Sequence, residues 1–299
     1  AMYESLKEHS KDFHLFIFAF DDRSYELLNK LNLEFVTVIS LLEFEDEELL
    51  SLKNDRTPAE YCWTCTPSII KYCIENYSLD SCTYLDADLY FFSNPDVLIN
   101  EMADKSVLIT KHNYTPEYDL SRTSGIYCVQ FMTFKNDTNG MKVLSWWRNA
   151  CNDWCYARME DGKFGDQKYL DDWTNRFEGI HELKHLGGGV APWNIQQYRL
   201  EEEKFQLIFY HFHGFKFLGG KKVSLVEGYK LRTIEIKMLY KPYILHLEKI
   251  MKQVTKIDNS YDYHGTMVQQ YDWKSPFRFL KTLLKANTNI YNKNKILGL

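Results

Sequence analysis

The segment CTYLDADLYFF, residues 82–92, places two acids inside an otherwise apolar, strand-like run. Asp86 and Asp88 are two residues apart, so in a strand their side chains would point to the same face. Two carboxylates held that close need a cation between them, or one of them must carry a proton. Carboxylate oxygens suit Mg²⁺ or Mn²⁺, which commonly bridge to substrate phosphates. We therefore predict that Asp86 and Asp88 hold a divalent ion together with a diphosphate; the alternative is a solvated turn with two acids.

A second group of candidate ligands lies in HFHGF, residues 211–215. In a strand His211 and His213 share a face, and a neutral imidazole can complete a metal shell begun by two carboxylates. Gly214 allows the backbone to come close to a ligand. The alternative is a pair of surface histidines with ordinary partners.

Two further segments carry polar or aromatic groups that could face a substrate. In KFGDQKYLDDW, Asp166 and Gln167 open a predicted helix, where Asp166 is either a cap or a polar group presented to the substrate. In HLGGGVAPWN, three glycines shape a loop that ends in Trp193 and Asn194. An aromatic face can stack on a sugar ring, so we expect this loop to contribute to acceptor binding.

The elements that must position these groups alternate along the chain. Runs with strand character and runs with helical spacing follow each other, which favours an α/β domain with a mostly parallel central sheet flanked by helices. Ligands bind such sheets at the carboxyl ends of the strands, where the two acids are expected. The predicted strands cover 14–20, 35–41, 82–92, 106–110, 125–134 and 205–215, and the predicted helices cover 21–31, 57–77, 139–161 and 241–254.

The composition indicates a soluble globular protein that does not bind nucleic acid. The chain has 299 residues, 45% of them hydrophobic, and a formal net charge of −5. No apolar run is long enough to span a bilayer, and the first residues have no signal-peptide core. The seven cysteines are predicted to be free thiols in a reducing cytoplasm. The alternative is a zinc site formed by Cys62, Cys65, Cys151 and Cys155.

The end of the chain differs in charge from the rest. Residues 272–299 contain six Lys or Arg and one acid, which leaves a net charge near −10 on the remainder. Phe277, Leu280 and Leu284 would form one apolar side of a helix, flanked by basic residues. We predict a main domain over 1–271 and a basic amphipathic helical tail over 272–299 that contacts an anionic membrane surface. The alternative is a closing helix that packs on the acidic body.

The order of these features resembles the nucleotide-diphospho-sugar transferases of the GT-A fold, a Rossmann-like α/β fold, and most of all bacterial enzymes akin to glycosyltransferase family 8. The resemblance runs from about Tyr3 to about Lys256. It is carried by YLDADLYFF, GIYCVQFMTFKND, FGDQKYL and HFHGF. In the family a nucleotide-binding strand precedes the helix that MYESLKEH matches, so the first strand is expected to be missing here.

The resemblance implies that Asp86 and Asp88 bind Mn²⁺ or Mg²⁺ with the donor diphosphate and that His211 contributes to the same metal. The family motif typically continues to Lys-Pro-Trp, whereas this chain reads HFHGFKFLGG. Lys216 therefore does not stand at the motif position that contacts the diphosphate, and His213 is an alternative to His211 as the metal ligand. The strand GIYCVQFMTF also lacks the usual Asn-x-Gly.

The expected function is thus a metal-dependent transfer of a sugar from a nucleotide donor, with UDP the expected nucleotide. The expected acceptor is a glycan or a lipid-linked molecule in bacterial surface polysaccharide assembly, used in the cytoplasm or at the inner face of the membrane. One alternative is a haloacid-dehalogenase-type phosphatase, which also uses D-x-D and a later G-D-x-x-x-x-D; Tyr90 and the strands before D-x-D argue against it. Another is a non-catalytic sugar-binding module.

Overall fold

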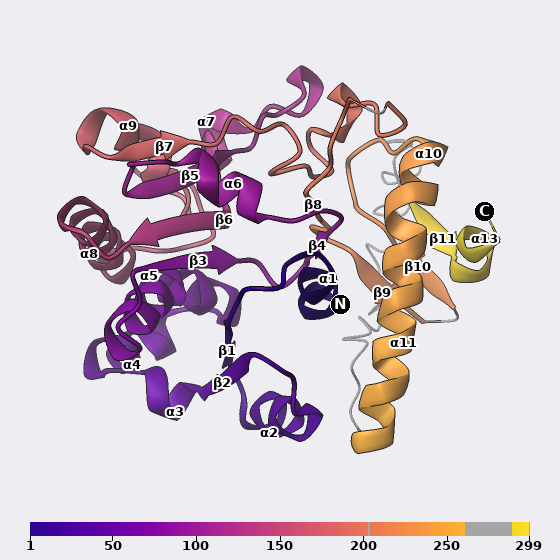
Figure 1. Ribbon diagram of the computed structural model, residues 1–299, viewed down its shortest axis with the longest axis horizontal. Coiled ribbons are helices and arrows are strands. Elements are labelled where there is room, and N and C mark those ends of the chain that lie inside the picture. Colours follow the sequence, from indigo (N-terminus) through magenta and orange to yellow (C-terminus); the bar gives the residue numbers. More distant parts are fainter. Residues whose placement is uncertain (203, 220, 261–288, 299) are drawn as a thin grey trace, which may run out of the picture.

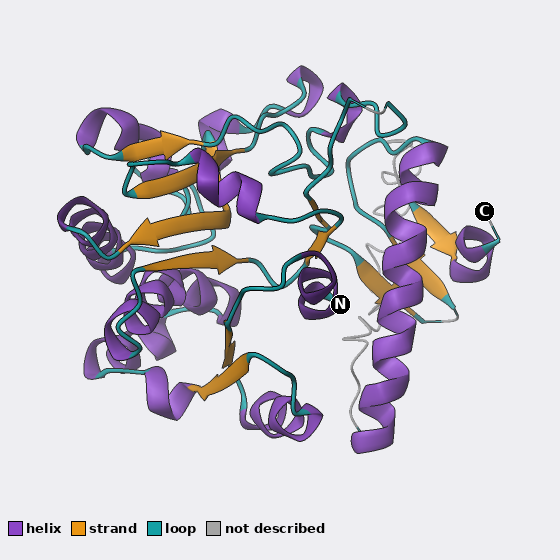
Figure 2. Ribbon diagram, viewed as in Figure 1, coloured by secondary structure: helices purple, strands orange, loops and turns teal. Residues whose placement is uncertain are grey.

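The computed structural model describes residues 1–202, 204–219, 221–260 and 289–298. In Figure 1 the four-stranded sheet and the helices next to it lie at the left of the molecule, and the long helix α11 lies at the right. Figure 2 shows how helices and strands are mixed throughout. The architecture is mixed α/β, as the alternation of elements predicts.

The chain opens with a helix and a parallel pair of strands. These elements are α1 Met2–His9, β1 Leu15–Ala19, α2 Asp22–Leu31 and β2 Val36–Ser40. β1 and β2 pair in parallel, and α2 connects them. Asp21 caps α2, the helix predicted over 21–31, by accepting a hydrogen bond from the Ser24 N–H.

The four-stranded sheet has the order β3-β6-β5-β7 and is mixed in direction. Its strands are β3 Ser81–Leu85, β5 Val107–Lys111, β6 Tyr127–Lys135 and β7 Ile180–Glu182. β6 runs antiparallel to both of its neighbours, and only β7 is parallel to β5. The prediction of a mostly parallel sheet is therefore wrong. The connection from β5 to β6 contains only the short helices η2 Pro116–Tyr118 and α7 Ser121–Ser124, and no helix long enough to cross the sheet face and return in parallel.

Two long helices, α5 Pro58–Asn76 and α8 Thr138–Asp153, pack on each other and contribute to the largest buried cluster. α5 begins with a capping box between Thr57 and Glu60, with Pro58 in its first turn. α8 ends eight residues before the predicted end at 161, because the following chain turns to let the Ala157 N–H donate to Glu60 at 2.7 Å.

The shorter helices lie between these elements. They are α3 Leu41–Phe44, α4 Glu47–Leu52, η1 Lys53–Asp55, α6 Asp96–Glu101, η3 Lys168–Asp172, α9 Trp173–Arg176, η4 Ile195–Gln197, α10 Thr233–Glu235 and the π-helical segment η5 Ile236–Tyr240. The strands β4 Leu89–Phe91 and β8 Phe209–His211 form a separate antiparallel pair. In Figure 1 this pair lies between the four-stranded sheet and α11.

The predicted late strand over 205–215 is shorter than expected. β8 covers only its centre, because the chain turns at Gly214, whose φ of +76° favours glycine. It then forms β9 Lys216–Leu218 and β10 Lys222–Ser224, and β10 pairs with β9 on one side and with β11 Ile290–Asn292 on the other. The C-terminal half of the core therefore holds a three-stranded antiparallel sheet.

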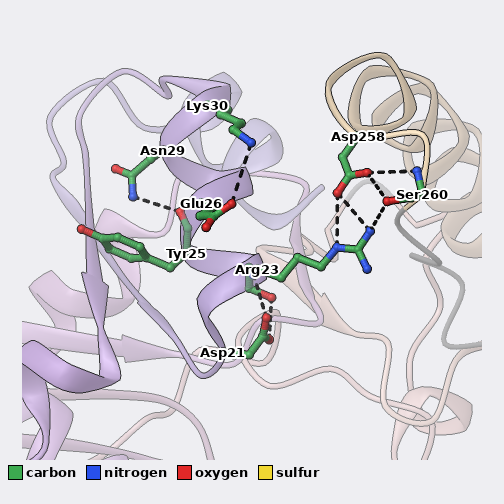
Figure 3. A network of polar contacts seen from close by, with 9 residues as sticks. Asp21, Arg23, Tyr25, Glu26, Asn29, Lys30, Asp258 and Ser260 are labelled. Carbon is green, nitrogen blue, oxygen red and sulfur yellow. Dashed lines mark hydrogen bonds and ion pairs between the residues drawn. The ribbon is translucent and has the colours of Figure 1, made fainter.

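The long helix α11 Lys241–Ile257 matches the helix predicted over 241–254. Its end is joined to α2 by the Arg23 guanidinium, which donates to Asp258 at 3.0 Å and to Ser260 at 2.7 Å (Figure 3). This contact connects the first parallel strand pair with the C-terminal half of the chain.

The predicted amphipathic tail is described only at its end. The residues proposed to contact a membrane lie outside the described residues, so that prediction stays untested. Residues 289–298 form β11 and α13 Lys293–Leu297, and Ile296 is buried in the core beside α11. Among the described residues, no helix has the length and apolar character required to cross a bilayer.

Candidate metal centre

Asp86 and Asp88 lie in a turn between β3 and β4 and not in one continuous strand. The Asp86 N–H donates to the Gln130 carbonyl of β6 at 3.0 Å, and the Leu89 N–H closes the turn on the Asp86 carbonyl at 3.2 Å. The expectation that both acids share a strand face is therefore wrong, because pairing with β6 ends at Leu85 and the chain leaves to pair with β8. The acids nevertheless occupy the carboxyl end of β3, where ligands are expected.

The pairing of β4 with β8 brings His211 to this turn. Leu89 lies opposite His211 in the antiparallel register, and the Phe212 N–H donates to the Asp88 carbonyl at 3.0 Å. The His211 Nε2 atom is 3.0 Å from Asp88 Oδ1 and 3.7 Å from Asp86 Oδ2. Its Nδ1 atom is 2.9 Å from the amide oxygen of Gln130. Residues separated by more than 120 positions thus meet at one point.

The charges at this point are strongly coupled. Burial raises the pKa of Asp86 to about 7, with the negative charge of Asp88 adding to the shift and His211 opposing it. Burial alone would raise the pKa of Asp88 and lower that of His211, but their mutual attraction reverses both shifts. Asp86, Asp88 and His211 thus favour the uptake of positive charge at this point, as a proton or as a cation.

The donor atoms fit a divalent cation. One ligand atom each from Asp88, His211 and His213 lies within 4.8 Å of the others, and Asp86 lies beside them. Donor atoms that bind one ion at about 2.0–2.2 Å are at most about 4.4 Å apart, so small side-chain adjustments suffice. Within the described residues, no other group of three or more such side chains is assembled. The alternative four-cysteine zinc site is among those that do not form.

His213 and Lys216 lie on the exposed side of this cluster. His213 follows β8 and is exposed, whereas His211 is only 4% exposed. The protein around the ring partly shields it from water, and this desolvation lowers the pKa of His213; the charge of His211 adds to the shift, Asp88 opposes it, and Lys216 adds a smaller effect. The exposed Lys216 side chain begins β9, so a cationic group stands near the histidines.

Asp166 belongs to the same electrostatic cluster, on its buried side. Burial raises the pKa of Asp166 to about 7, and the charge of Asp86 adds to this shift. Asp166 does not cap the following helix η3, whose N-cap position is Gln167. The Gln167 amide donates to the Ser124 carbonyl at 2.6 Å and so fixes the loop before β6.

Trp193 and Asn194 form the wall behind the histidines. The Trp193 ring is 5.4 Å from the His211 ring and 5.6 Å from the His213 ring, and its indole N–H donates to the His112 carbonyl. Trp193 is 5% exposed and Asn194 is fully buried, with its amide donating to the His112 and Gly189 carbonyls. Both side chains hold the loop in place and present little surface to a ligand.

Two residues next to the centre were not predicted from the sequence. Tyr84 donates its hydroxyl to Asp86 Oδ1 at 2.9 Å, and Gln130 contacts both His211 and the backbone of Asp86. The sequence around Tyr84 does not distinguish it from other aromatic residues in strands. Gln130 could have been identified, because it is a polar amide inside the apolar run YCVQFMTF.

The chain is similar to two proteins of Bacillus subtilis (strain 168). It is 33% identical to the uncharacterized protein YfnD over 265 residues, which covers 85% of each chain. It is 28% identical to the uncharacterized protein YfnF over 278 residues, covering 88% of this chain and 91% of YfnF. No protein-family model matches the sequence.

Two solved structures are similar to this chain at lower identity. The apo form of mouse xyloside xylosyltransferase 1 aligns with a TM-score of 0.44 at 14% identity, covering 70% of this chain and 89% of that one. A glycosyltransferase involved in glycosylation of the major capsid of PBCV-1 aligns with a TM-score of 0.40 at 12% identity, covering 68% and 93%.

Proposed function

This chain belongs to the family of YfnD from Bacillus subtilis, and we propose that it is a metal-dependent glycosyltransferase that uses a nucleotide-diphosphate sugar. One observation carries the proposal. Asp88 and His211 lie 3.0 Å apart, with Asp86 and His213 beside them, at the carboxyl end of a sheet strand. The D-x-D and H-F-x-G motifs that supply these groups are those of the family-8-like transferases that the sequence resembles.

The ion that suits this donor set best is Mn²⁺. Carboxylate oxygens suit both Mg²⁺ and Mn²⁺, but imidazole nitrogens are softer donors that suit transition metals better than Mg²⁺. Asp86, Asp88 and His211 would hold the ion, and His213 would complete the shell or contact the donor phosphates. A bound divalent ion supplies positive charge that stabilises the departing nucleoside diphosphate.

The surrounding residues are proposed to bind and orient the donor. Lys216, exposed and near His213, would contact the diphosphate. Asp166, buried next to Asp86, would accept a hydrogen bond from a hydroxyl of the transferred sugar, and Gln167 would hold the adjoining loop. Trp193 and Asn194 would shape the acceptor side through the loop they fix, since both are buried.

The finer identity of the substrates rests on the resemblance alone. We propose a UDP-sugar as the donor and a glycan or lipid-linked molecule of bacterial surface polysaccharide assembly as the acceptor. The reaction would then take place in the cytoplasm or at the inner face of the membrane.

The test begins with a thermal-shift screen of nucleotide sugars with and without Mn²⁺, followed by an assay of nucleotide release for each donor that binds. Asp88→Asn should abolish release while leaving the fold intact, because it removes a charge but little volume. Asp12→Asn, an exposed acid before β1, is the matched control and should keep full activity. Metal-independent turnover or an active Asp88→Asn enzyme would refute the proposal, and hydrolysis of p-nitrophenyl phosphate would favour a phosphatase instead.

A further inference from the structure

Gln130 is a buried amide in the central strand of the four-stranded sheet. It lies in β6, is 0% exposed, and is followed by Phe131, which is also buried. Its side-chain oxygen is 2.9 Å from His211 Nδ1, and its main-chain carbonyl accepts the Asp86 N–H at 3.0 Å. One residue of β6 thus contacts both the aspartate turn and the histidine that β8 supplies.

We propose that Gln130 is a positioning residue that fixes the His211 tautomer required for binding a cation. A neutral imidazole carries its hydrogen on one nitrogen and a lone pair on the other. An amide oxygen can only accept, so its contact with Nδ1 keeps the hydrogen there and leaves the lone pair on Nε2. Nε2 is the nitrogen that faces Asp88 at 3.0 Å and Asp86 at 3.7 Å. In metal sites, a hydrogen bond to the ring nitrogen that does not bind the metal orients the histidine ligand and raises the affinity of the site for the metal.

Stability alone does not explain an amide at this position. The Gln130 side-chain nitrogen is buried and has no hydrogen-bond partner among the described residues. A buried donor without a partner costs about 1–3 kcal/mol, which an apolar side chain of similar size would avoid. The amide therefore lowers the stability of the fold, and its contact with His211 is the reason we infer for its presence.

The loop above Gln130 is shaped to leave room for this amide. A Cβ atom on Gly189 would lie 3.2 Å from the Gln130 nitrogen and 2.7 Å from Thr110 Cγ2. Gly189 also has a φ of +90°, which side chains rarely adopt. The third glycine of GGG thus lets the loop that leads to Trp193 pass close over Gln130.

The inference rests on the proposed metal site and is tested by Mn²⁺ affinity. Gln130→Met keeps the length of the side chain and removes the oxygen that accepts from His211 Nδ1. The affinity for Mn²⁺ should therefore fall about 10- to 100-fold. The EPR signal of the free ion measures this affinity. Gln130→Glu restores an acceptor for Nδ1–H and should bind Mn²⁺ nearly as tightly as the unaltered chain. Gln196→Met is the matched control and should leave the affinity unchanged, because the hydrogen bonds of Gln196 to described residues go to Thr115, Pro192 and Lys230 and not to the proposed ligands.

A double-mutant comparison shows whether Gln130 acts through His211. In the His211→Ala background, Gln130→Met should have no further effect on Mn²⁺ affinity, because the ring that it orients is gone. If Gln130→Met binds Mn²⁺ as well as the unaltered chain while His211→Ala does not, the positioning role is wrong and the proposed function stands. If the unaltered chain does not bind Mn²⁺, the proposed function itself fails.

A measurement on the unaltered sequence covers the case in which Gln130→Met does not fold. In ¹⁵N-histidine-labelled protein loaded with diamagnetic Cd²⁺, the His211 signals are assigned by their loss in His211→Ala. We expect a hydrogen on Nδ1 and a metal-bound Nε2. A hydrogen on Nε2 would mean that the amide donates to the ring, and would overturn the inference.

Discussion

The binding of Mn²⁺ to this chain should depend on pH, because protons compete with the metal for the same groups. The His211 ring lies 3.0 Å from Asp88 and 3.7 Å from Asp86, and these carboxylates raise its pKa against the opposing effect of burial. Burial also raises the pKa of Asp86 to about 7. A metal must therefore displace one or both of these protons before it can bind.

The magnitude follows from the number of protons displaced. Each proton released gives about a tenfold rise in apparent affinity per pH unit, equivalent to ~1.4 kcal/mol. If one group releases a proton, the affinity should rise by up to about tenfold per pH unit below the pKa of that group; if His211 and Asp86 both release one, the slope approaches about a hundredfold. The rise should end above the pKa values of both groups.

Isothermal titration calorimetry in buffers of different ionisation enthalpy measures both the affinity and the protons released. His211→Ala should lower the number of released protons by one. His181, whose ring nitrogen lies 2.8 Å from Glu101 in a separate hydrogen bond, supplies the control, and His181→Ala should leave the slope unchanged. An affinity that is flat or decreases between pH 6 and pH 7 would refute the reasoning.

The stability of the metal-free chain should change in the opposite direction. The pKa values of Asp86 and His211 are higher in the folded than in the unfolded chain, so the folded chain holds more protons between about pH 5 and pH 8. Their contribution is present at low pH and is lost as the pH rises through the folded-state values. The melting temperature without metal should therefore fall from pH 5.5 to pH 8, and added Mn²⁺ should restore it at pH 8.

Other substitutions test the rest of the site. His211→Ala should weaken Mn²⁺ binding more than His213→Ala, because His211 is buried and held at both ring nitrogens; equal losses in titration would contradict this. Asp166→Asn should lower nucleotide release but raise the melting temperature at pH 8, since it removes a buried charge whose pKa is raised to about 7; calorimetry that shows destabilisation would oppose this. Gly187→Ala should destabilise by about 1–3 kcal/mol or more, because its Cβ would lie 1.8 Å from a main-chain carbonyl oxygen, whereas Gly219→Ala, in open space, should change the free energy of unfolding by less than about 0.5 kcal/mol.

Local patterns in the sequence predicted most of the helices and strands and identified the main candidate metal ligands. The cap at Asp21 and the helix that opens at Pro58 depend on neighbouring residues only, so their positions could be read from the chain. The chemistry of Asp86 and Asp88 was also readable, because two acids at the end of an apolar run require a partner in any fold.

Only the tertiary structure decided how strands pair and which side chains meet. The direction of β6 depends on long-range hydrogen bonds with β3 and β5, and no local pattern encodes it. The same holds for the β4–β8 register that carries His211 to the aspartates, and for the contact with Gln130. Burial of Trp193 and Asp166 likewise follows from what packs over them. Residue types set the possible chemistry of this site, and contacts between distant segments selected which groups share it.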